Sequence, residues 1–321
     1  MCRCSSVRFA SRRSTSRNRR VQTAIAPSSS RWKTSSCIAI SSRCAGRRPA
    51  SRTRCRPFTT PVAPTGLHTA QPVPESVRVE NSFIGTDGVG EKTERSIWEQ
   101  GVTHWDEFEP SVVGGQRGDR IQQFIDEGRD RVAETDVTYF DHAFPSSERW
   151  RLYETFRERA CFFDIETTGL DQDRNQVTTV SLHQDGDTQT LIAGDDLTAG
   201  NLRAAFDGAD LLVTFNGKRF DVPFLEANFD VDLDRPHLDL MYTCKKIGLS
   251  GGLKQVEQDI GIERDRPDIS GQDAVRLWRE HEQGRDGALE TLVSYNREDT
   301  VNLKTLAETA TERLDEQIFV G

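Results

Sequence analysis

The apolar run at residues 160–166 carries two acidic side chains, Asp164 and Glu166. Side chains alternate along a strand, so a strand here turns both carboxylates to the same face. Two carboxylates on one face repel each other unless a cation or a proton lies between them. An edge strand with a solvated acidic face is the alternative, but the neighbouring Phe162 and Phe163 favour a central strand.

Asp221 and Asp299 are two further acids at positions of chemical interest. Asp221 follows the apolar run 211–215 at the start of an expected helix, where a ligand site and a simple helix cap are both reasonable. Asp299 fills a gap in the leucine stripe of a helix expected over 286–316, so its carboxylate points toward the core. A buried lone carboxylate is unfavourable without a metal ion or a hydrogen-bond donor. Tyr295 lies one turn earlier on the same side, as part of a site or as an ordinary core aromatic.

Three motifs follow one another along the chain: Asp164-x-Glu166, Asn216-x3-Phe220-Asp221 and Tyr295-x3-Asp299. Their order and spacing resemble the DEDD 3′–5′ exonucleases of the RNase H-like superfamily. The tyrosine subtype is indicated, because Ser294 stands where the histidine subtype has His. The segments between the motifs resemble the YprB-like branch of this superfamily, and the resemblance covers residues 158–318.

This resemblance implies a metal-dependent 3′–5′ exonuclease acting on DNA or RNA that is single-stranded or has a free 3′ end. The implied catalytic residues are Asp164, Glu166, Asp221, Tyr295 and Asp299. Four carboxylates form a hard-oxygen cluster suited to two Mg²⁺ or Mn²⁺ ions, which clamp the attacking and leaving oxygens of a phosphodiester. Tyr295 is expected to orient the attacking water, since a phenol of pKa ~10 is a poor base at pH 7.

Nucleic-acid contacts are expected from Thr167, Asn216 and Lys218, which adjoin the acidic motifs in the sequence. Asp239 is expected to cap a helix rather than to act as a fifth acid. Two other functions stay open: a non-catalytic nucleic-acid-binding or scaffold protein on the same fold, and a structure-specific endonuclease. The intact acidic set favours an enzyme over a scaffold.

A glycine-containing loop before an amphipathic stretch marks a small module at residues 76–110. Gly88 and Gly90 can expose backbone N–H groups to a phosphate, and Lys92 follows them. The segment resembles a helix-hairpin-helix module, which implies sequence-independent contact with a nucleic-acid backbone. A small helical packing unit is an equally good interpretation. Residues 111–157 are expected to be a helical connector.

The remaining elements of residues 158–318 are consistent with the resemblance. The expected strands are 160–166, 176–183, 187–193 and 210–215. The expected helices are 221–229, 239–247, 251–260, 271–283 and 286–316. A three-stranded meander followed by alternating helices and strands is typical of an α/β fold, here an RNase H-like mixed sheet flanked by helices and preceded by a small helical module.

Charge divides the chain into two unlike parts. Residues 1–75 carry 15 basic side chains and one acid, whereas the rest carries 27 basic and 50 acidic side chains, a net charge of −23. The basic segment is expected to be disordered. It is interpreted as a nucleic-acid-binding arm, an organelle transit peptide or, by preference, translated sequence upstream of a true start near Val77 or Val79.

The acidic part contains only six lysines, which suggests adaptation to high salt, where self-repulsion is screened. No apolar run approaches the ~20 residues of a membrane-spanning helix, so we expect no membrane partner and a cytoplasmic location. None of the six histidines shows metal-ligand spacing.

Overall fold

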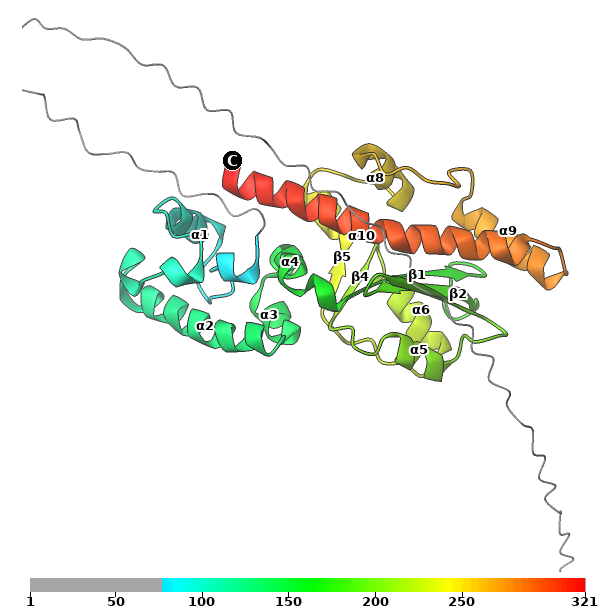
Figure 1. The fold of residues 1–321 in the computed structure, drawn as a ribbon, viewed down its shortest axis with the longest axis horizontal. Coiled ribbons are helices and arrows are strands. Elements are labelled where there is room, and N and C mark those ends of the chain that lie inside the picture. The colour runs from blue at the N-terminus through cyan, green and yellow to red at the C-terminus, as the bar shows by residue number, and fades with distance from the viewer. Residues whose placement is uncertain (1–76, 321) are drawn as a thin grey trace, which may run out of the picture. The chain divides into compact units, whose positions relative to one another are not determined.

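A mixed sheet of five strands runs through the computed structural model, which describes residues 77–320 (Figure 1). The predictions on residues 1–75 lie outside this range. The strands are β1 Ala160–Thr167, β2 Val177–Gln184, β3 Asp187–Ile192, β4 Leu211–Thr214 and β5 His237–Asp239. Their order across the sheet is β3-β2-β1-β4-β5; β3, β2 and β1 are antiparallel neighbours, while β4 and β5 extend the sheet in parallel. The predicted meander and the mixed α/β sheet are confirmed.

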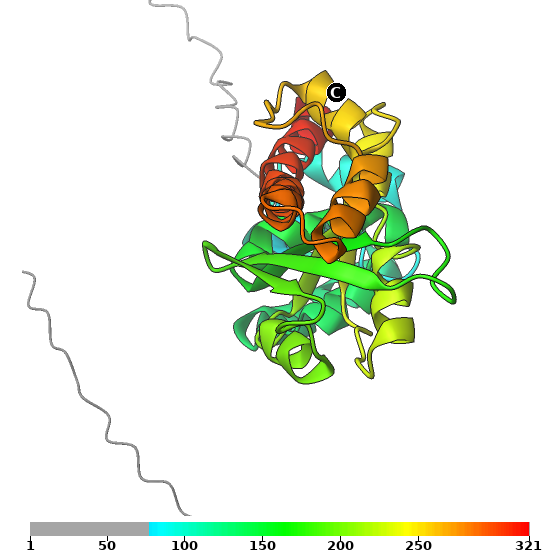
Figure 2. The same cartoon turned by 90° about the vertical axis from the view of Figure 1, so that its right-hand side faces the viewer.

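Helices cover both faces of this sheet, as Figure 2 shows. One face packs against α9 (Gly271–Glu282) and α10 (Ala288–Val320), and the other against α5 (Ala199–Ala205) and α6 (Asp221–Asn228). The alternation of β1 explains the two layers. Phe162 packs in the cluster that contains the leucines of α10, whereas Phe163 packs with residues of α5 and α6.

Two short helices, α7 (Leu240–Lys246) and α8 (Leu253–Ile260), connect β5 to the segment before α9. The predicted helix 239–247 therefore corresponds to α7, and the sequence missed β5 and α5. As predicted, Asp239 caps this helix, because its carboxylate accepts a hydrogen bond from the backbone N–H of Met241 at 3.1 Å.

The N-terminal part of the described chain is helical. Its helices are α1 Glu91–Trp98, α2 Gly115–Ala133, α3 Val137–Ala143 and α4 Leu152–Phe156. Buried aromatic rings hold them together, with Trp105 between the rings of Phe124 and Phe140 at centroid distances of 5.6 and 6.4 Å. The same apolar cluster continues to Leu314 of α10, so this region and the face of the sheet under α10 share a core.

The helix-hairpin-helix expectation is not supported by the structure of residues 77–110. Within residues 77–110, only short 3₁₀ turns stand before the loop of Gly88 and Gly90 and after α1, at Trp105–Glu107, so α1 has no second α-helix there with which to form the hairpin. The physical reason lies in Glu94, a fully buried carboxylate of α1. It accepts hydrogen bonds from the Ser82 hydroxyl at 2.7 Å and the Phe83 backbone N–H at 2.8 Å, which fixes the incoming chain without a helix.

Arg151 extends this buried polar network toward the sheet. Its guanidinium contacts Glu94 at 2.8 Å and Glu148 at 2.9 Å, and all three side chains are almost fully buried. Glu148 also contacts Lys246 of α7. The network therefore ties the loop before α1 to the helix that follows β5.

Within the described residues, none of the helices combines the length and apolar composition that membrane crossing requires.

Asp315, near the end of α10, is a buried acid with little compensation. Burial, followed by the charges of Glu154 and Glu312, raises its pKa to about 7, although the backbone N–H of Val77 and the charge of Arg151 act in the opposite direction. A carboxyl group whose pKa is raised on folding stabilises the protein fully below its ordinary pKa. This contribution is lost as the pH rises through about 7.

We therefore expect Asp315→Asn to stabilise the protein at pH 8 by about 1–2 kcal/mol, a value reduced for partial solvent access, and to have little effect near pH 4. Urea unfolding of both proteins at the two pH values measures the difference. The exposed Glu316→Gln serves as control. An equal effect of Asp315→Asn at both pH values would contradict the assignment.

Candidate metal centre

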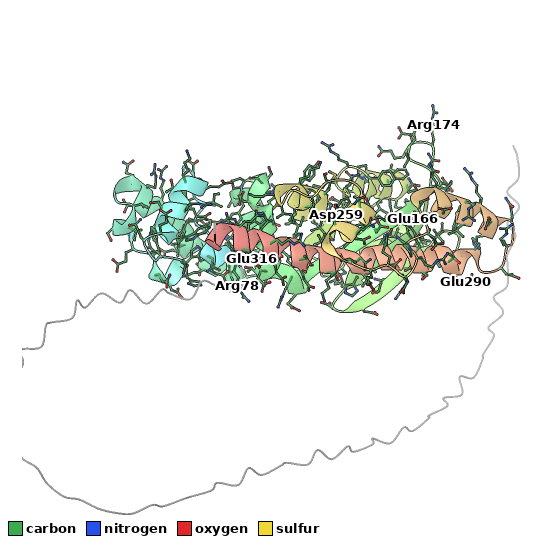
Figure 3. The ribbon with its side chains drawn as sticks, turned by 90° about the horizontal axis from the view of Figure 1, so that it is seen from above. Arg78, Glu166, Arg174, Asp259, Glu290 and Glu316 are labelled. Atoms are coloured by element: carbon green, nitrogen blue, oxygen red, sulfur yellow. The ribbon has the colours of Figure 1, made fainter. Side chains whose placement is uncertain are left out.

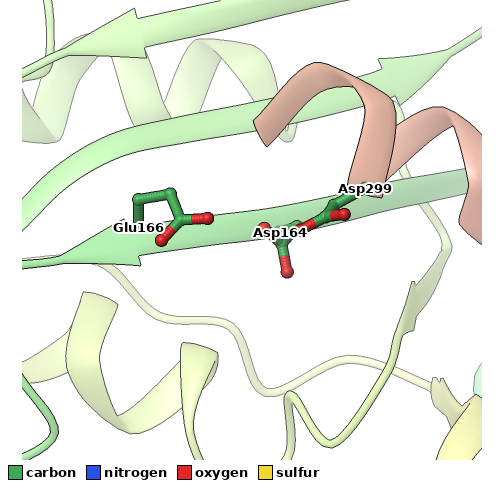
Figure 4. A group of neighbouring side chains, drawn as sticks. All are labelled: Asp164, Glu166 and Asp299. Atoms are coloured by element: carbon green, nitrogen blue, oxygen red, sulfur yellow. The ribbon is translucent and has the colours of Figure 1, made fainter. Parts of the chain in front are cut away.

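Three carboxylates meet between β1 and α10. Asp164, Glu166 and Asp299 each place one oxygen within 4.8 Å of the others, a grouping that can hold a metal ion (Figure 4). Glu166 and Asp299 are buried and Asp164 is half-buried. Figure 3 shows Glu166 within the body of the protein, whereas Arg174 of the loop after β1 projects away from it. The sequence predicted that these three acids come together.

Asp221, the fourth predicted acid, stands beside this group without belonging to it. It is buried at the start of α6, where the backbone N–H groups of Ile165 in β1 and of Asp221 itself favour its charged form and so lower its pKa. Burial and then the charge of Asp164 raise its pKa well above the ordinary range. Asp221 also raises the pKa of Glu166. Asp164, Glu166 and Asp221 thus act on one another electrostatically.

The pKa shifts show how little of this negative charge the protein compensates. Burial raises the pKa of Asp164 to about 7, although Asn296 and Arg264 favour its charged form. Burial, then the charges of Asp164 and Asp221, raise the pKa of Glu166 strongly. Carboxylate oxygens that are close, buried and undercompensated are a donor set that suits Mg²⁺ or Mn²⁺, so the residues fit the implied metal.

Asn296 orients Asp164, and its role is clear only from the structure. Its amide donates to the Asp164 carboxylate at 2.7 Å and to the Asp164 carbonyl at 3.2 Å. The side-chain oxygen Oδ1 of Asn296 accepts a hydrogen bond from the hydroxyl of Thr179 in β2 at 2.9 Å, which fixes the orientation of the side-chain amide. Asn296 is fully buried. Its position three residues before Asp299 puts it on the same inward stripe of α10, but the sequence does not reveal its partners.

Arg264 is a cation that sequence reasoning missed. It lies between α8 and α9, with its side chain 5% exposed, and contacts Asp299 and, at 3.3 Å, Glu257. Glu257 is also held by the side-chain amide of Asn302 at 3.0 Å. A loop arginine has no periodic pattern to mark it. Its pairing with Asp299 makes it the protein's own counter-charge at this site.

Tyr295 lies next to Arg264 and a second cation, Lys254. Its ring is buried, with the Lys254 ammonium 4.9 Å and the Arg264 guanidinium 5.6 Å from the ring centroid. Burial, then the charges of Glu166 and Asp164, raise the pKa of the Tyr295 phenol further above its ordinary value. The phenol therefore stays protonated and can donate a hydrogen bond, but it is a poor base.

The predicted nucleic-acid contacts lie in two separate places. The Thr167 hydroxyl donates to the carbonyl of Gly169 at 2.6 Å. Asn216 and Lys218 belong to the loop after β4, whose backbone N–H groups bind the Asp239 carboxylate at 2.7 and 3.4 Å. Thr167 and this loop adjoin the acids. By contrast, the exposed Gly88, Gly90 and Lys92 lie in and after the loop before α1, which Figure 1 places away from β1.

Replacement of Arg264 tests its role as counter-charge. We expect Arg264→Met to destabilise the metal-free protein by about 3 kcal/mol, because buried carboxylates lose a partner. We expect the same variant to bind Mn²⁺ more tightly, since a competing cation is gone. Thermal unfolding in EDTA and calorimetric Mn²⁺ titration measure the two effects.

Arg266→Met is the matched control for this variant, because Arg266 lies in the same loop, has a half-exposed side chain and pairs with Asp268 at 3.0 Å. Weaker Mn²⁺ binding by Arg264→Met, or equal behaviour of the two variants, would contradict the role.

Comparison with known proteins finds a family match for the part of the chain that contains the sheet. Residues 161–311 match the family model described as the RNase H superfamily. No curated protein matches the chain. Among solved structures, a nuclease in its apo form is 21% identical, with 49% of this chain and 74% of that chain covered and a TM-score of 0.37.

Two further structures are similar at a lower level. The family B DNA polymerase from Pyrobaculum calidifontis is 19% identical, with 47% of this chain and 27% of that chain covered and a TM-score of 0.36. Brucella melitensis NrnC is 16% identical, with 51% and 89% covered and a TM-score of 0.28. The match to the RNase H superfamily model and the five-stranded mixed sheet thus fall in the same part of the chain.

Proposed function

We propose that this protein is a metal-dependent nuclease that hydrolyses phosphodiester bonds. The observation that carries the proposal is the meeting of Asp164, Glu166 and Asp299 within 4.8 Å on an RNase H-like domain, with Asp221 beside them. Such a cluster stores repulsion in a metal-free fold, so its presence favours a function that uses a divalent cation.

The four acids would hold Mg²⁺ or Mn²⁺, as two ions. Bound there, the metal supplies Lewis-acid stabilisation of the phosphoryl oxygens and a water of lowered pKa. Asn296 holds the Asp164 carboxylate toward the site, and Tyr295 donates a hydrogen bond that positions the attacking water. Lys254 and Arg264, which face the Tyr295 ring, add positive charge beside the bond that is cleaved.

The finer proposal is a 3′–5′ exonuclease that acts on DNA or RNA with a single-stranded or free 3′ end. Its support is the order of the three motifs and the presence of Tyr295 in the third. A structure-specific endonuclease could use the same acids, and a non-catalytic scaffold could retain the fold. Comparing circular with linear substrates distinguishes an exonuclease from an endonuclease. Measuring metal binding distinguishes an enzyme from a scaffold.

We expect Asp164→Ala to lower hydrolysis at least about 100-fold, because the metal loses a central ligand. Tyr295→Phe is expected to lower kcat about 10- to 100-fold, because the water is less well positioned. The assay uses linear 5′-labelled and circular single-stranded DNA and RNA with Mn²⁺, in low and high KCl.

In this assay the exposed Asp173→Asn is the control. Progressive shortening from the 3′ end supports the exonuclease, whereas cleavage of circles indicates an endonuclease. Retained Mn²⁺-dependent cleavage by Asp164→Ala would refute the assignment.

Metal binding is expected to depend on pH. In the metal-free protein burial raises the pKa of Asp164 to about 7, so a proton competes with the metal below that pH. Mn²⁺ should therefore raise the unfolding temperature more at pH 8 than at pH 6. Asp164→Asn should remove most of this stabilisation together with its pH dependence. Equal stabilisation of the unaltered protein at the two pH values would contradict this account.

A further inference from the structure

A cavity lies along β5, between the loop after β4 and α7. Its volume is about 630 Å³. Residues of the segment before α4, of the loop after β4, of β5 and of α7 line it, among them Arg149, Trp150, Lys218, Tyr242, Lys245 and Lys246. The proposed catalytic chemistry uses none of these side chains, so the cavity requires its own explanation.

Several cations in or beside the cavity form no direct ion pair, although the Asp239 carboxylate also lines it. Within residues 77–318, no carboxylate lies within 4.0 Å of the charged groups of Lys218, Arg219 or Lys245, whereas Arg149 pairs with Asp141 and Lys246 with Glu148. Three of the six lysines in this part of the chain, which carries 50 acids, line the one cavity: Lys218, Lys245 and Lys246. Their grouping creates a local positive field that attracts a phosphate.

An exposed aromatic ring stands among these cations. Tyr242 is 44% exposed, and the Arg219 guanidinium and Lys245 ammonium lie 6.0 and 5.4 Å from its ring centroid. Exposed cation–π contacts contribute about 0.5–1 kcal/mol, while stacking of a nucleobase on an aromatic side chain contributes about 1–3 kcal/mol. A base can therefore replace a cation on the ring, and the released cation can bind the adjoining phosphate.

Trp150 adds an unsatisfied donor to the cavity wall. It is 3% exposed, and its indole N–H has no acceptor within the described part of the chain. Because this N–H is closed to solvent, Trp150 shapes the cavity wall, and the proposed contacts do not depend on its N–H. Neighbouring His237 adds no positive charge, because burial lowers its pKa to about 3.

The loop after β4 connects the cavity to the acids. Lys218 lines the cavity, and three residues later Asp221 faces Asp164. Three residues span at most about 10 Å, so a strand held in the cavity can reach the metal centre within one or two nucleotides. Asp239 fixes this loop through the backbone N–H groups of Asn216 and Lys218, which keeps the distance constant.

We propose that this cavity binds a nucleotide unit of a single-stranded nucleic acid, next to the unit that enters the metal centre. The base stacks on Tyr242, and Lys218, Arg219 and Lys245 bind its phosphates. The proposal rests on the proposed nuclease function and adds to it a binding subsite. Stacking and phosphate contacts are common to DNA and RNA, so both are tested.

Strand binding in EDTA tests the cavity without the metal centre. Fluorescence anisotropy is measured with 5′-labelled ten-nucleotide oligo(dT) and oligo(U). We expect Lys245→Glu to weaken binding at least tenfold and to reduce the slope of log affinity against log salt by about 0.7. Tyr242→Ala is expected to weaken binding about tenfold, while Tyr242→Phe, which retains the ring, should bind like the unaltered protein.

Lys304→Glu is the matched control, because it makes the same charge change on an exposed lysine of α10 outside the cavity. Its binding should change less than twofold. Equal weakening by Lys304→Glu and Lys245→Glu, or unchanged binding by Lys245→Glu, would overturn the proposal. So would tight binding of free AMP with no binding of either oligonucleotide. A loss with only one of the two oligonucleotides supports the subsite and identifies its sugar preference.

Hydrolysis of bis(p-nitrophenyl) phosphate with Mn²⁺ separates this proposal from the proposed function. This small diester reaches the metal centre without the cavity, so Tyr242→Ala and Lys245→Glu should cleave it normally while KM for the ten-nucleotide strand rises. If the unaltered protein cleaves no diester yet the binding pattern holds, the nuclease assignment fails and the subsite stands. If cleavage is normal and the variants bind strands normally, the subsite fails alone.

Discussion

The structure depends on one electrostatic constraint: three carboxylates meet in a small, poorly solvated space between β1 and α10, and a fourth, Asp221 of α6, is buried beside them. Repulsion and burial act together against their charged forms, as the raised pKa values of Asp164, Glu166 and Asp221 show. The surrounding groups act in the opposite direction. Asn296 donates to Asp164, and Arg264 pairs with Asp299. These contacts hold the acids in place but leave enough negative charge for a divalent cation.

The N-terminal helical region supports the cavity beside the acids. Arg151 joins Glu94 of α1 to Glu148, and Glu148 in turn contacts Lys246 of α7, whose neighbour Lys245 lines the cavity. Breaking such a buried network leaves an uncompensated charge, so the chain before β1 positions the wall of the cavity rather than merely preceding the sheet.

Periodic features were predictable from the sequence, and contacts made by loops were not. The alternation of β1 placed Asp164 and Glu166 on one face, and the stripe of α10 turned Asp299 inward. Arg264 has no such pattern, because its partners lie in other elements. The three residues of β5 form a strand only through their pairing with β4.

The glycine loop before α1 is a different case, because here the sequence predicted a structure, the helical hairpin, that the chain does not form. Gly88 and Gly90 resemble a phosphate-binding hairpin, but the chain leading into this loop is fixed from within by Glu94. The glycine motif predicts that backbone N–H groups are exposed, but it does not predict the path of the chain before the loop. That path is set by the buried Glu94 side chain. Contact of Gly88, Gly90 and Lys92 with nucleic acid stays a prediction.

Charge repulsion from the acidic residues and the contacts made by the cations around Tyr242 act over different distances. A protein of negative net charge can therefore still bind a nucleic-acid strand at the cavity in the way proposed. Repulsion between a strand and a body of net charge −23 acts over a distance set by screening, about 10 Å at 0.1 M salt and about 3 Å at 1 M. The cations around Tyr242 act at contact, together with stacking, which needs no charge. Salt therefore removes the long-range repulsion sooner than it removes the stacking contribution at the cavity. If the cavity binds a nucleic-acid strand as proposed, this difference would let an acidic protein hold a polyanion at raised salt.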